Sequence, residues 1–158
     1  MDRSYLPIIQ HHAKNFNLEP NLVRAVIQVE SEGDTWAARF EPGWKWFVSP
    51  KTWAKIVKVS QSTETVCQAM SFGLMQVMGA VARELGMTED LTKLCSPDTG
   101  IYYGCKKLRK EIDRWGSIER GLAAYNAGSP NSSVGQQYAK KVLKIFEKLN
   151  TDSQSLIT

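Results

Sequence analysis

The chain has 158 residues, of which 42% are hydrophobic and 23% are charged, and it carries a net charge of +4 with a pI of about 9.0. This composition excludes an intrinsically disordered chain, and no apolar run is long enough for a transmembrane helix. The length is sufficient for one domain with its own hydrophobic core, without support from metals or disulfides.

Positive charge gathers late in the chain, over residues 106–110 and 140–148. Acidic residues accompany both clusters, so we interpret them as solvated helix faces, with an anionic polymer or surface as the alternative partner. No nucleic-acid-binding motif accompanies them, so we expect no nucleic-acid partner. The cysteines, Cys67, Cys95 and Cys105, lack metal-ligand spacing, and we expect free thiols or, in an oxidising compartment, one disulfide.

The first predicted helix spans residues 5–16, where Leu6, Ile9 and Ala13 recur at helical spacing. Residues 1–10 lack the basic start and the long apolar centre of a secretory signal peptide. If the protein acts outside the cytoplasm, we therefore expect another route to export it.

The second helix, predicted over residues 20–32, carries a carboxylate at the end of an apolar run. Val26 and Ile27 belong to its buried face, and Glu30 follows Val26 by one turn, so the same periodicity carries Glu30 inward. Burial disfavours the charged form of a carboxyl group, and the neutral form is the one that a general acid needs near neutral pH. The alternative is that Glu30 is a solvated residue at the helix end.

Residues 34–49 are irregular but rich in aromatic side chains. Pro42 and Gly43 break the segment into loops, while its aromatic density is too high for a free linker. Two interpretations stay open: a wall on which sugar rings stack, or a hydrophobic cluster that caps the core. The aromatic residues are Trp36, Phe40, Trp44, Trp46 and Phe47.

Residues 71–78 form an apolar segment that contains Gly73 and Gln76. A buried glutamine needs partners for both ends of its amide, which a sugar hydroxyl, an acetamido group or the backbone would supply. Further helices are predicted near 50–59, 63–70, 80–85, 96–116, 117–125 and 138–149. The chain is thus expected to be a bundle of about seven or eight helices over 1–149, with a disordered tail over 150–158.

Three segments, in this order, resemble the catalytic domain of the soluble lytic transglycosylases. They are Val29-Glu30-Ser31, Gly73-Leu74-Met75-Gln76 and Ala124-Tyr125-Asn126-Ala127-Gly128. Leu18-Glu19-Pro20 and Tyr138 also match, so the resemblance covers about 5–149. It implies a mainly α, lysozyme-like helical domain, α+β in the broad sense with little or no strand.

The resemblance also implies an activity, which is cleavage of the bond between N-acetylmuramic acid and N-acetylglucosamine in peptidoglycan, without metal or cofactor. Glu30 would be the single acid/base, the muramyl acetamido group would assist, and the product would be a 1,6-anhydro sugar. We expect a monomer that acts at the bacterial cell wall without membrane insertion. Such a domain is typical of a phage or prophage, with export by phage lysis, in the virion or by specialised secretion.

Positions within the matched motifs imply further site residues. Met75 and Gln76 would line the cleft beside the acid. Tyr125 and Asn126 would hydrogen-bond the acid and the acetamido group, and Tyr138 would border the site. These side chains combine apolar surface, which raises the pKa of a carboxyl group, with directed hydrogen bonds.

Two departures from the family pattern concern the region between the first two motifs. Gly73 follows Glu30 by 43 positions, which predicts an insertion over about 40–62 beside the cleft. Ser71 is then our substitute for the serine that the family places between these motifs, and Ser31 is a further expected substrate-binding residue.

The insertion also brings a second carboxylate, Glu41. If Glu41 faces Glu30 across about 6.5–9.5 Å, it would position water for an inverting hydrolase of the lysozyme type. The alternative is an ion pair with Arg39 or Arg24. A third hypothesis from another class is a cell-wall-binding module whose cleft is retained but idle.

Overall fold

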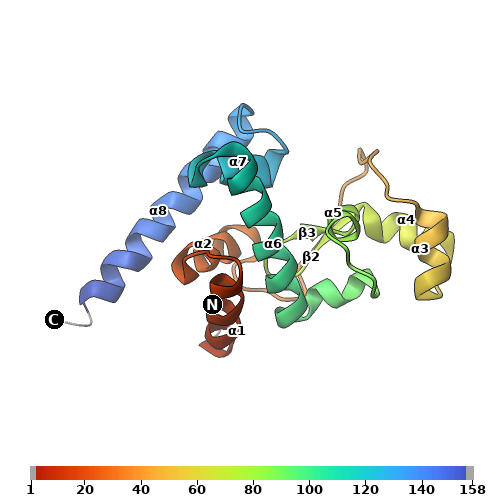
Figure 1. Cartoon of the computed structure of the whole chain (residues 1–158), viewed down its shortest axis with the longest axis horizontal. Coiled ribbons are helices and arrows are strands. Elements are labelled where there is room, and N and C mark those ends of the chain that lie inside the picture. Colours follow the sequence, from red (N-terminus) through yellow and green to blue (C-terminus); the bar gives the residue numbers. More distant parts are fainter. Residues whose placement is uncertain (1–2, 156–158) are drawn as a thin grey trace.

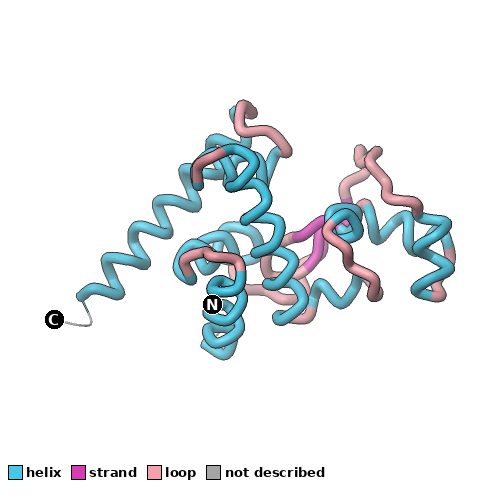
Figure 2. The backbone as a smooth tube through the Cα atoms, in the orientation of Figure 1, coloured by secondary structure: helices cyan, strands magenta, loops and turns pink. Residues whose placement is uncertain are grey.

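The structure, a computed structural model, describes residues 3–155 and is mainly helical, as predicted (Figures 1 and 2). Two 3₁₀ turns, Arg3–Tyr5 and Leu91–Cys95, accompany the regular elements. In chain order these are α1 (Leu6–Asn15), α2 (Pro20–Ser31), β1 (Ala38–Phe40), α3 (Pro50–Val57), α4 (Gln61–Gln68), β2 (Met70–Phe72), β3 (Val77–Met78), α5 (Gly79–Glu84), α6 (Pro97–Trp115), α7 (Ile118–Ala127) and α8 (Ser133–Ser155). No described helix combines the length and apolarity needed to cross a membrane.

Local sequence signals account for most of the helix ends. Pro20 occupies the first turn of α2, where its missing N–H is not needed. Ser117 caps α7 by accepting a hydrogen bond from the backbone N–H of Arg120 at 3.2 Å. Gly116 ends α6 in the left-handed region, with a φ of 78°, which glycine adopts without steric penalty.

Helix α2 lies at the centre of the molecule, between α1 and α8 (Figure 1). Its side chains Leu22, Val26 and Ile27 are at most 1% exposed. Helix α8 packs on α2, and α7 packs on both α8 and α6, which extends the core. The end of α2 is therefore held by its own buried face, which makes it a fixed platform for a functional side chain.

A small antiparallel sheet in the order β1-β2-β3 lies beside this core (Figure 2). Ser71 pairs with Arg39 on one side and with Met78 on the other. These strands have only two or three residues, which is too short for an alternating pattern to reveal them in the sequence. The sheet brings residues 38–40 against the apolar segment 71–78.

The residues for which we predicted an insertion, about 40–62, form a loop over residues 41–49 followed by α3 and the start of α4. Helices α3 and α4 pack against each other at the opposite end of the molecule from the C-terminus (Figure 1). The ring of Trp53 on α3 lies 4.6 Å from the guanidinium carbon of Arg83 on α5. This contact ties the helical pair to the rest of the chain.

The prediction of a disordered tail over 150–158 is wrong for its described part, because α8 continues to Ser155. The amide of Asn21 on α2 donates a hydrogen bond to Asn150 at 2.7 Å, which anchors the last turns of α8. Thr151 and Ser153 donate hydrogen bonds to backbone carbonyls one turn earlier. Residues 156–158 lie outside the described residues.

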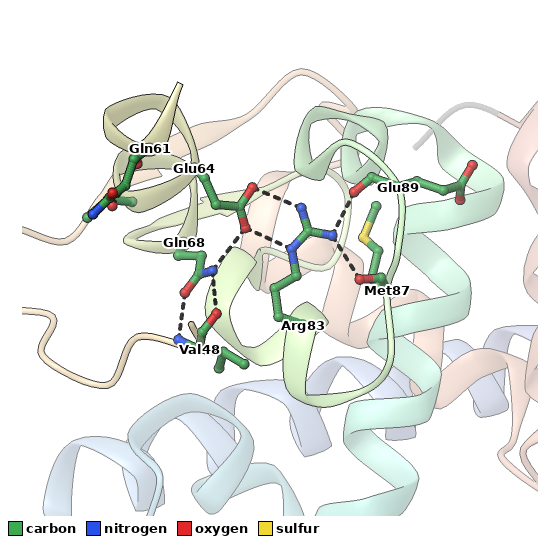
Figure 3. Close-up of polar contacts among 8 residues, drawn as sticks. Val48, Gln61, Glu64, Gln68, Arg83, Met87 and Glu89 are labelled. Carbon is green, nitrogen blue, oxygen red and sulfur yellow. Dashed lines mark hydrogen bonds and ion pairs between the residues drawn. The ribbon is translucent and has the colours of Figure 1, made fainter. Parts of the chain in front are cut away.

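A buried ion pair joins α4 to α5 (Figure 3). Arg83 donates two hydrogen bonds to the Glu64 carboxylate, at 2.8 and 2.9 Å, and both side chains are at most 2% exposed. Nη1 of Arg83 donates to the carbonyl oxygens of Met87 and Glu89, and Gln68 donates a further bond to Glu64 at 2.9 Å. Each charge is thus paired and hydrogen-bonded, which is the condition for tolerating charge in a core.

We expect Arg83→Met to lower the free energy of unfolding by about 3–5 kcal/mol, because it leaves the Glu64 carboxylate buried without its cation. Urea unfolding at pH 7 measures this loss. The double variant Arg83→Met/Glu64→Leu should recover part of it, since no unpaired charge remains. A double variant no more stable than the single one would contradict this explanation.

The same pair makes stability depend on pH. Burial raises the pKa of Glu64, but hydrogen bonds from Arg83 and Gln68 and the charge of Arg83 outweigh burial, so the pKa lies below its ordinary value of 4.5. The stabilisation is therefore present above the unfolded-state pKa and is lost as the pH falls through the folded-state pKa.

Candidate active site

A pocket of about 290 Å³ opens at the end of α2. It is bounded by the sheet, the loop 41–49, α6 and α7, and its lining residues are Glu30, Arg39, Glu41, Gly43, Trp44, Trp46, Ser71, Gln76, Met78, Lys107, Tyr125 and Asn126. A second hollow of about 520 Å³ shares part of this lining, including Lys107 and Asn126. The two hollows adjoin along these shared residues, and we call them together the cleft.

Glu30 is the carboxylic acid at the inner wall of the cleft. Its side chain is partly buried, and Tyr138 on α8 donates a hydrogen bond to Oε1 at 2.7 Å. Burial raises the pKa of Glu30 above its ordinary value, while the Tyr138 hydrogen bond and the charges of Lys107 and Arg39 oppose this rise without cancelling it. Glu30 therefore holds its proton to higher pH than a solvated glutamate does.

Tyr125 does not hydrogen-bond the acid, contrary to our expectation. Its hydroxyl donates to the backbone carbonyl of Met75 at 2.6 Å, which satisfies a phenol that is 2% exposed. The Tyr125 and Tyr138 rings stack with centroids 6.5 Å apart, so one tyrosine packs on the other. Tyr138, expected only to border the site, makes the direct contact with Glu30.

Gln76 lines the cleft as predicted, and the protein satisfies both ends of its amide. Its Oε1 accepts a hydrogen bond from Ser71 at 2.9 Å, and its Nε2 donates to the carbonyls of Ala37 and Gly73. The partners are thus largely backbone groups, one of the alternatives left open by the sequence. Ser71 lines the cleft as well, and Asn126 is exposed there.

Two other predicted site residues lie behind the cleft wall. Ser31 donates a hydrogen bond to the carbonyl of Leu74 at 2.8 Å and joins the end of α2 to the following turn. Met75 is fully buried, and a Cβ at Gly104 would lie only 2.3 Å from its sulfur. Neither side chain lines the cleft, so both act in the structure as its support.

The second carboxylate of the cleft, Glu41, forms an ion pair with Arg39 at 2.6 Å. This agrees with the alternative expected from the sequence, in which Glu41 is paired. The ion pair is partly exposed, so it contributes little to stability. The pair places a positive charge beside the Glu41 carboxylate.

The aromatic segment is only partly a cleft wall. Trp44 and Trp46 line both hollows, with their rings edge to face at 5.3 Å, and the Trp44 indole N–H donates to the Trp46 carbonyl at 2.9 Å. Trp36 and Phe40 are exposed by 76% and 52% and lie outside the cleft lining. The sugar-wall interpretation therefore applies to two tryptophans.

Both ends of the loop 41–49 are fixed by hydrogen bonds. The N–H of Glu41 donates to the carbonyl of Ala69 at 2.8 Å. Near the other end, Gln68 accepts from the N–H of Val48 at 2.7 Å and donates to its carbonyl at 3.0 Å. Because Gln68 is itself bonded to Glu64, the buried ion pair of Figure 3 also supports this wall.

Lys107 is a cleft residue that our sequence analysis assigned to a solvated helix face. Its ammonium group lies 3.9 Å from the centroid of the Tyr125 ring. Burial lowers the pKa of Lys107 to about 8, although the charges of Glu30 and Glu111 raise it. The sequence did hold a signal that Lys107 is not fully solvated. Gly104 lies one turn before Lys107 and Leu108 lies one residue after it, and both belong to the buried face of α6.

Comparisons with known proteins identify a family and two relatives that this chain is similar to. A family model described as the transglycosylase SLT domain matches residues 7–146. A transglycosylase of Enterobacteria phage PRD1 is 30% identical over 146 residues, which cover 90% of this chain and 43% of that protein. A peptidoglycan-binding-like protein of Escherichia coli O157:H7 is 26% identical over 141 residues, covering 85% of this chain and 73% of that protein. The chain thus spans less than half the length of the phage relative.

We expect Glu30→Gln to raise the melting temperature at neutral pH. The folded-state pKa of Glu30 is raised, so its contribution to stability is fully present below the unfolded-state value of 4.5 and is lost as the pH rises through the folded-state pKa. A glutamine stays neutral throughout, so the variant's advantage should grow from acidic to neutral pH. Thermal unfolding at several pH values measures this difference.

Glu41→Gln is the matched control, because it removes the other carboxylate of the same pocket, the one that is paired with Arg39. A Glu30→Gln variant that is equally or less stable than the wild type at neutral pH would contradict the raised pKa.

Proposed function

The chain belongs to the transglycosylase SLT family, and we propose that it is a lytic transglycosylase that cleaves the bond between N-acetylmuramic acid and N-acetylglucosamine in peptidoglycan. SLT domains are mainly helical and lysozyme-like, in agreement with the architecture described above. The observation that carries the proposal is a glutamic acid with a raised pKa, held by a tyrosine at the wall of an open cleft.

In the proposed reaction, the Glu30 carboxyl group protonates the glycosidic oxygen as the bond from that oxygen to C1 of the muramyl sugar breaks. The acetamido carbonyl oxygen of the same sugar bonds to C1 and replaces the leaving group. The C6 hydroxyl then attacks C1, the acetamido oxygen departs, and the Glu30 carboxylate accepts the hydroxyl proton. The products are a 1,6-anhydromuramic end and a free N-acetylglucosamine end, and no water is consumed.

The surroundings of Glu30 suit both of its roles. Burial favours the neutral acid that donates a proton in the first step. The Tyr138 hydroxyl and the positive charges of Lys107 and Arg39 favour the carboxylate that must exist before the second step. An intermediate pKa is what a group that first gives and then takes a proton requires.

A mechanism in which Glu30 is the single acid/base agrees with the surroundings of the second carboxylate, Glu41. Glu41 is engaged by Arg39 at 2.6 Å, so its charge is already compensated. Its presence in the same pocket as Glu30 is the observation that favours a second candidate function, a hydrolytic muramidase in which Glu41 would position water. The two candidates differ in their products.

The proposed substrate is the glycan strand of peptidoglycan, with Trp44 and Trp46 as the wall on which sugar rings pack. Gln76 and Ser71 would shape the cleft beside the acid, and Asn126 would offer an exposed amide to the sugar. We propose that the protein acts on the bacterial cell wall as a monomer without a cofactor. The phage relative named as a transglycosylase supports a phage or prophage setting.

Mass spectrometry of fragments released from purified peptidoglycan tests the proposal. We expect 1,6-anhydromuramic ends from the wild type, and a loss of at least about 100-fold in Glu30→Gln, because a positioned acid/base contributes on the order of 10²–10⁴. Glu41→Gln, the matched carboxylate variant, should release the same anhydro products. Reducing ends that have gained water, and that disappear in Glu41→Gln, would establish the muramidase instead.

A non-catalytic module would give a different result in the same experiment. The wild type would then release no fragment, while both the wild type and Glu30→Gln would bind the glycan.

Tyr138→Phe should shift the pH profile of kcat/KM. Loss of the hydroxyl removes a hydrogen bond that favours the carboxylate, so the pKa of Glu30 rises. The alkaline limb of the profile, where kcat/KM falls because Glu30 loses its proton, then moves to higher pH. We expect kcat to fall between about 10- and 100-fold, the equivalent of one hydrogen bond to a charged group. Tyr125→Phe, which removes a hydroxyl bonded to Met75 instead, should leave the limb in place. A limb that stays, or moves to lower pH, in Tyr138→Phe would contradict the assigned contact.

A further inference from the structure

Lys107 is a cation of the cleft that neither donates nor accepts a proton in the proposed reaction. It projects from α6 and lines both hollows, including the one that contains Glu30. Its ammonium group lies over the Tyr125 ring, at 3.9 Å from the centroid. The face of the ring attracts the positive charge and helps to hold the side chain. It offers no oxygen or nitrogen atom that could accept a hydrogen bond from the ammonium group.

No carboxylate within residues 3–155 lies within ion-pair distance of Lys107. Glu111, one turn later on α6, accepts a hydrogen bond from the Trp115 indole at 3.1 Å. Glu30 is bonded to Tyr138 through Oε1. By contrast, Arg39, the other cation of the Glu30 pocket, is already paired with Glu41.

A partly buried cation has lost part of its hydration. Without a carboxylate partner, Lys107 replaces that hydration only by the contact with the Tyr125 ring. With a pKa of about 8, Lys107 remains mostly protonated at neutral pH. An anion that entered the cleft would restore charge-assisted hydrogen bonds to the ammonium group. A neutral side chain of similar length would fill the same space without losing the hydration of a charge, so packing alone does not explain a lysine at this position.

We propose that Lys107 is a carboxylate-binding residue of the cleft and recognises an acidic substituent on the muramyl sugar. This inference rests on the proposed function, because it takes the muramyl unit to lie in the pocket of Glu30. Two sources share the chemistry: the lactyl group of a peptide-free strand ends in a carboxylate, and a stem peptide attached there carries carboxylates of its own. Lys107 would thus favour muramyl-containing strands over glycans without acidic substituents.

Binding measurements in the Glu30→Gln background, which prevents turnover, test this inference. Calorimetry would use muramyl-containing fragments with carboxylates intact and the same fragments with carboxylates converted to neutral methylamides. We expect about tenfold tighter binding of the intact fragments, the equivalent of about 1.4 kcal/mol. Lys107→Met should abolish this preference and Lys107→Arg should retain part of it, since arginine keeps the charge.

Lys140→Met provides the matched control for net charge. Lys140 is exposed on α8 and lines neither hollow, so the preference for intact fragments should persist. A preference that survives in Lys107→Met, or that disappears equally in Lys140→Met, would overturn the inference.

Two further comparisons separate the outcomes. A preference confined to peptide-free fragments would identify the lactyl carboxylate, and one confined to peptide-bearing fragments would identify the peptide; either supports the inference. Anhydro product from the wild type, with the preference retained in Lys107→Met, would overturn this inference alone. No product and no binding of any fragment would overturn the proposed function and, with it, this inference.

Discussion

The site depends on one constraint, which is that the carboxyl group of Glu30 is held partly out of water at the end of α2. The buried side chains of α2 fix the helix between its neighbours, so the backbone that carries Glu30 is held at the cleft. Tyr138, far along the chain on α8, meets this carboxyl group at 2.7 Å. Burial and the tyrosine act on its pKa in opposite directions, and burial prevails.

The walls around this acid are built by hydrogen bonds between distant segments. The turn after β2 is fixed by Gln76 and by the Tyr125 bond to Met75, so the wall facing Glu30 is rigid before any ligand enters. The opposite wall, the loop 41–49, is held through Gln68 by the buried pair of Glu64 and Arg83. Charge buried far from the acid thus helps to maintain the shape of the cleft.

Local patterns were sufficient to predict the main helices and the place of Glu30, because helical periodicity determines which side of α2 is buried. Gln76 and Ser71, expected at the site from the family resemblance, both line the pocket of Glu30. The sequence could not show that Tyr138 rather than Tyr125 meets the acid, since the choice depends on how α7 and α8 pack. The same limit applies to Met75 and Ser31, which lie behind the wall. For Lys107 a signal did exist, because Gly104 and Leu108 on α6 belong to a buried face.

The most direct test of the account is the pKa of Glu30 itself, measured by ¹³C NMR titration of the side-chain carboxyl resonances. The resonance of Glu30 is assigned by its absence in Glu30→Gln. We expect a titration midpoint above the ordinary value of 4.5. A midpoint at or below that value would mean that burial does not control this carboxyl group, and would contradict its role as the proton donor.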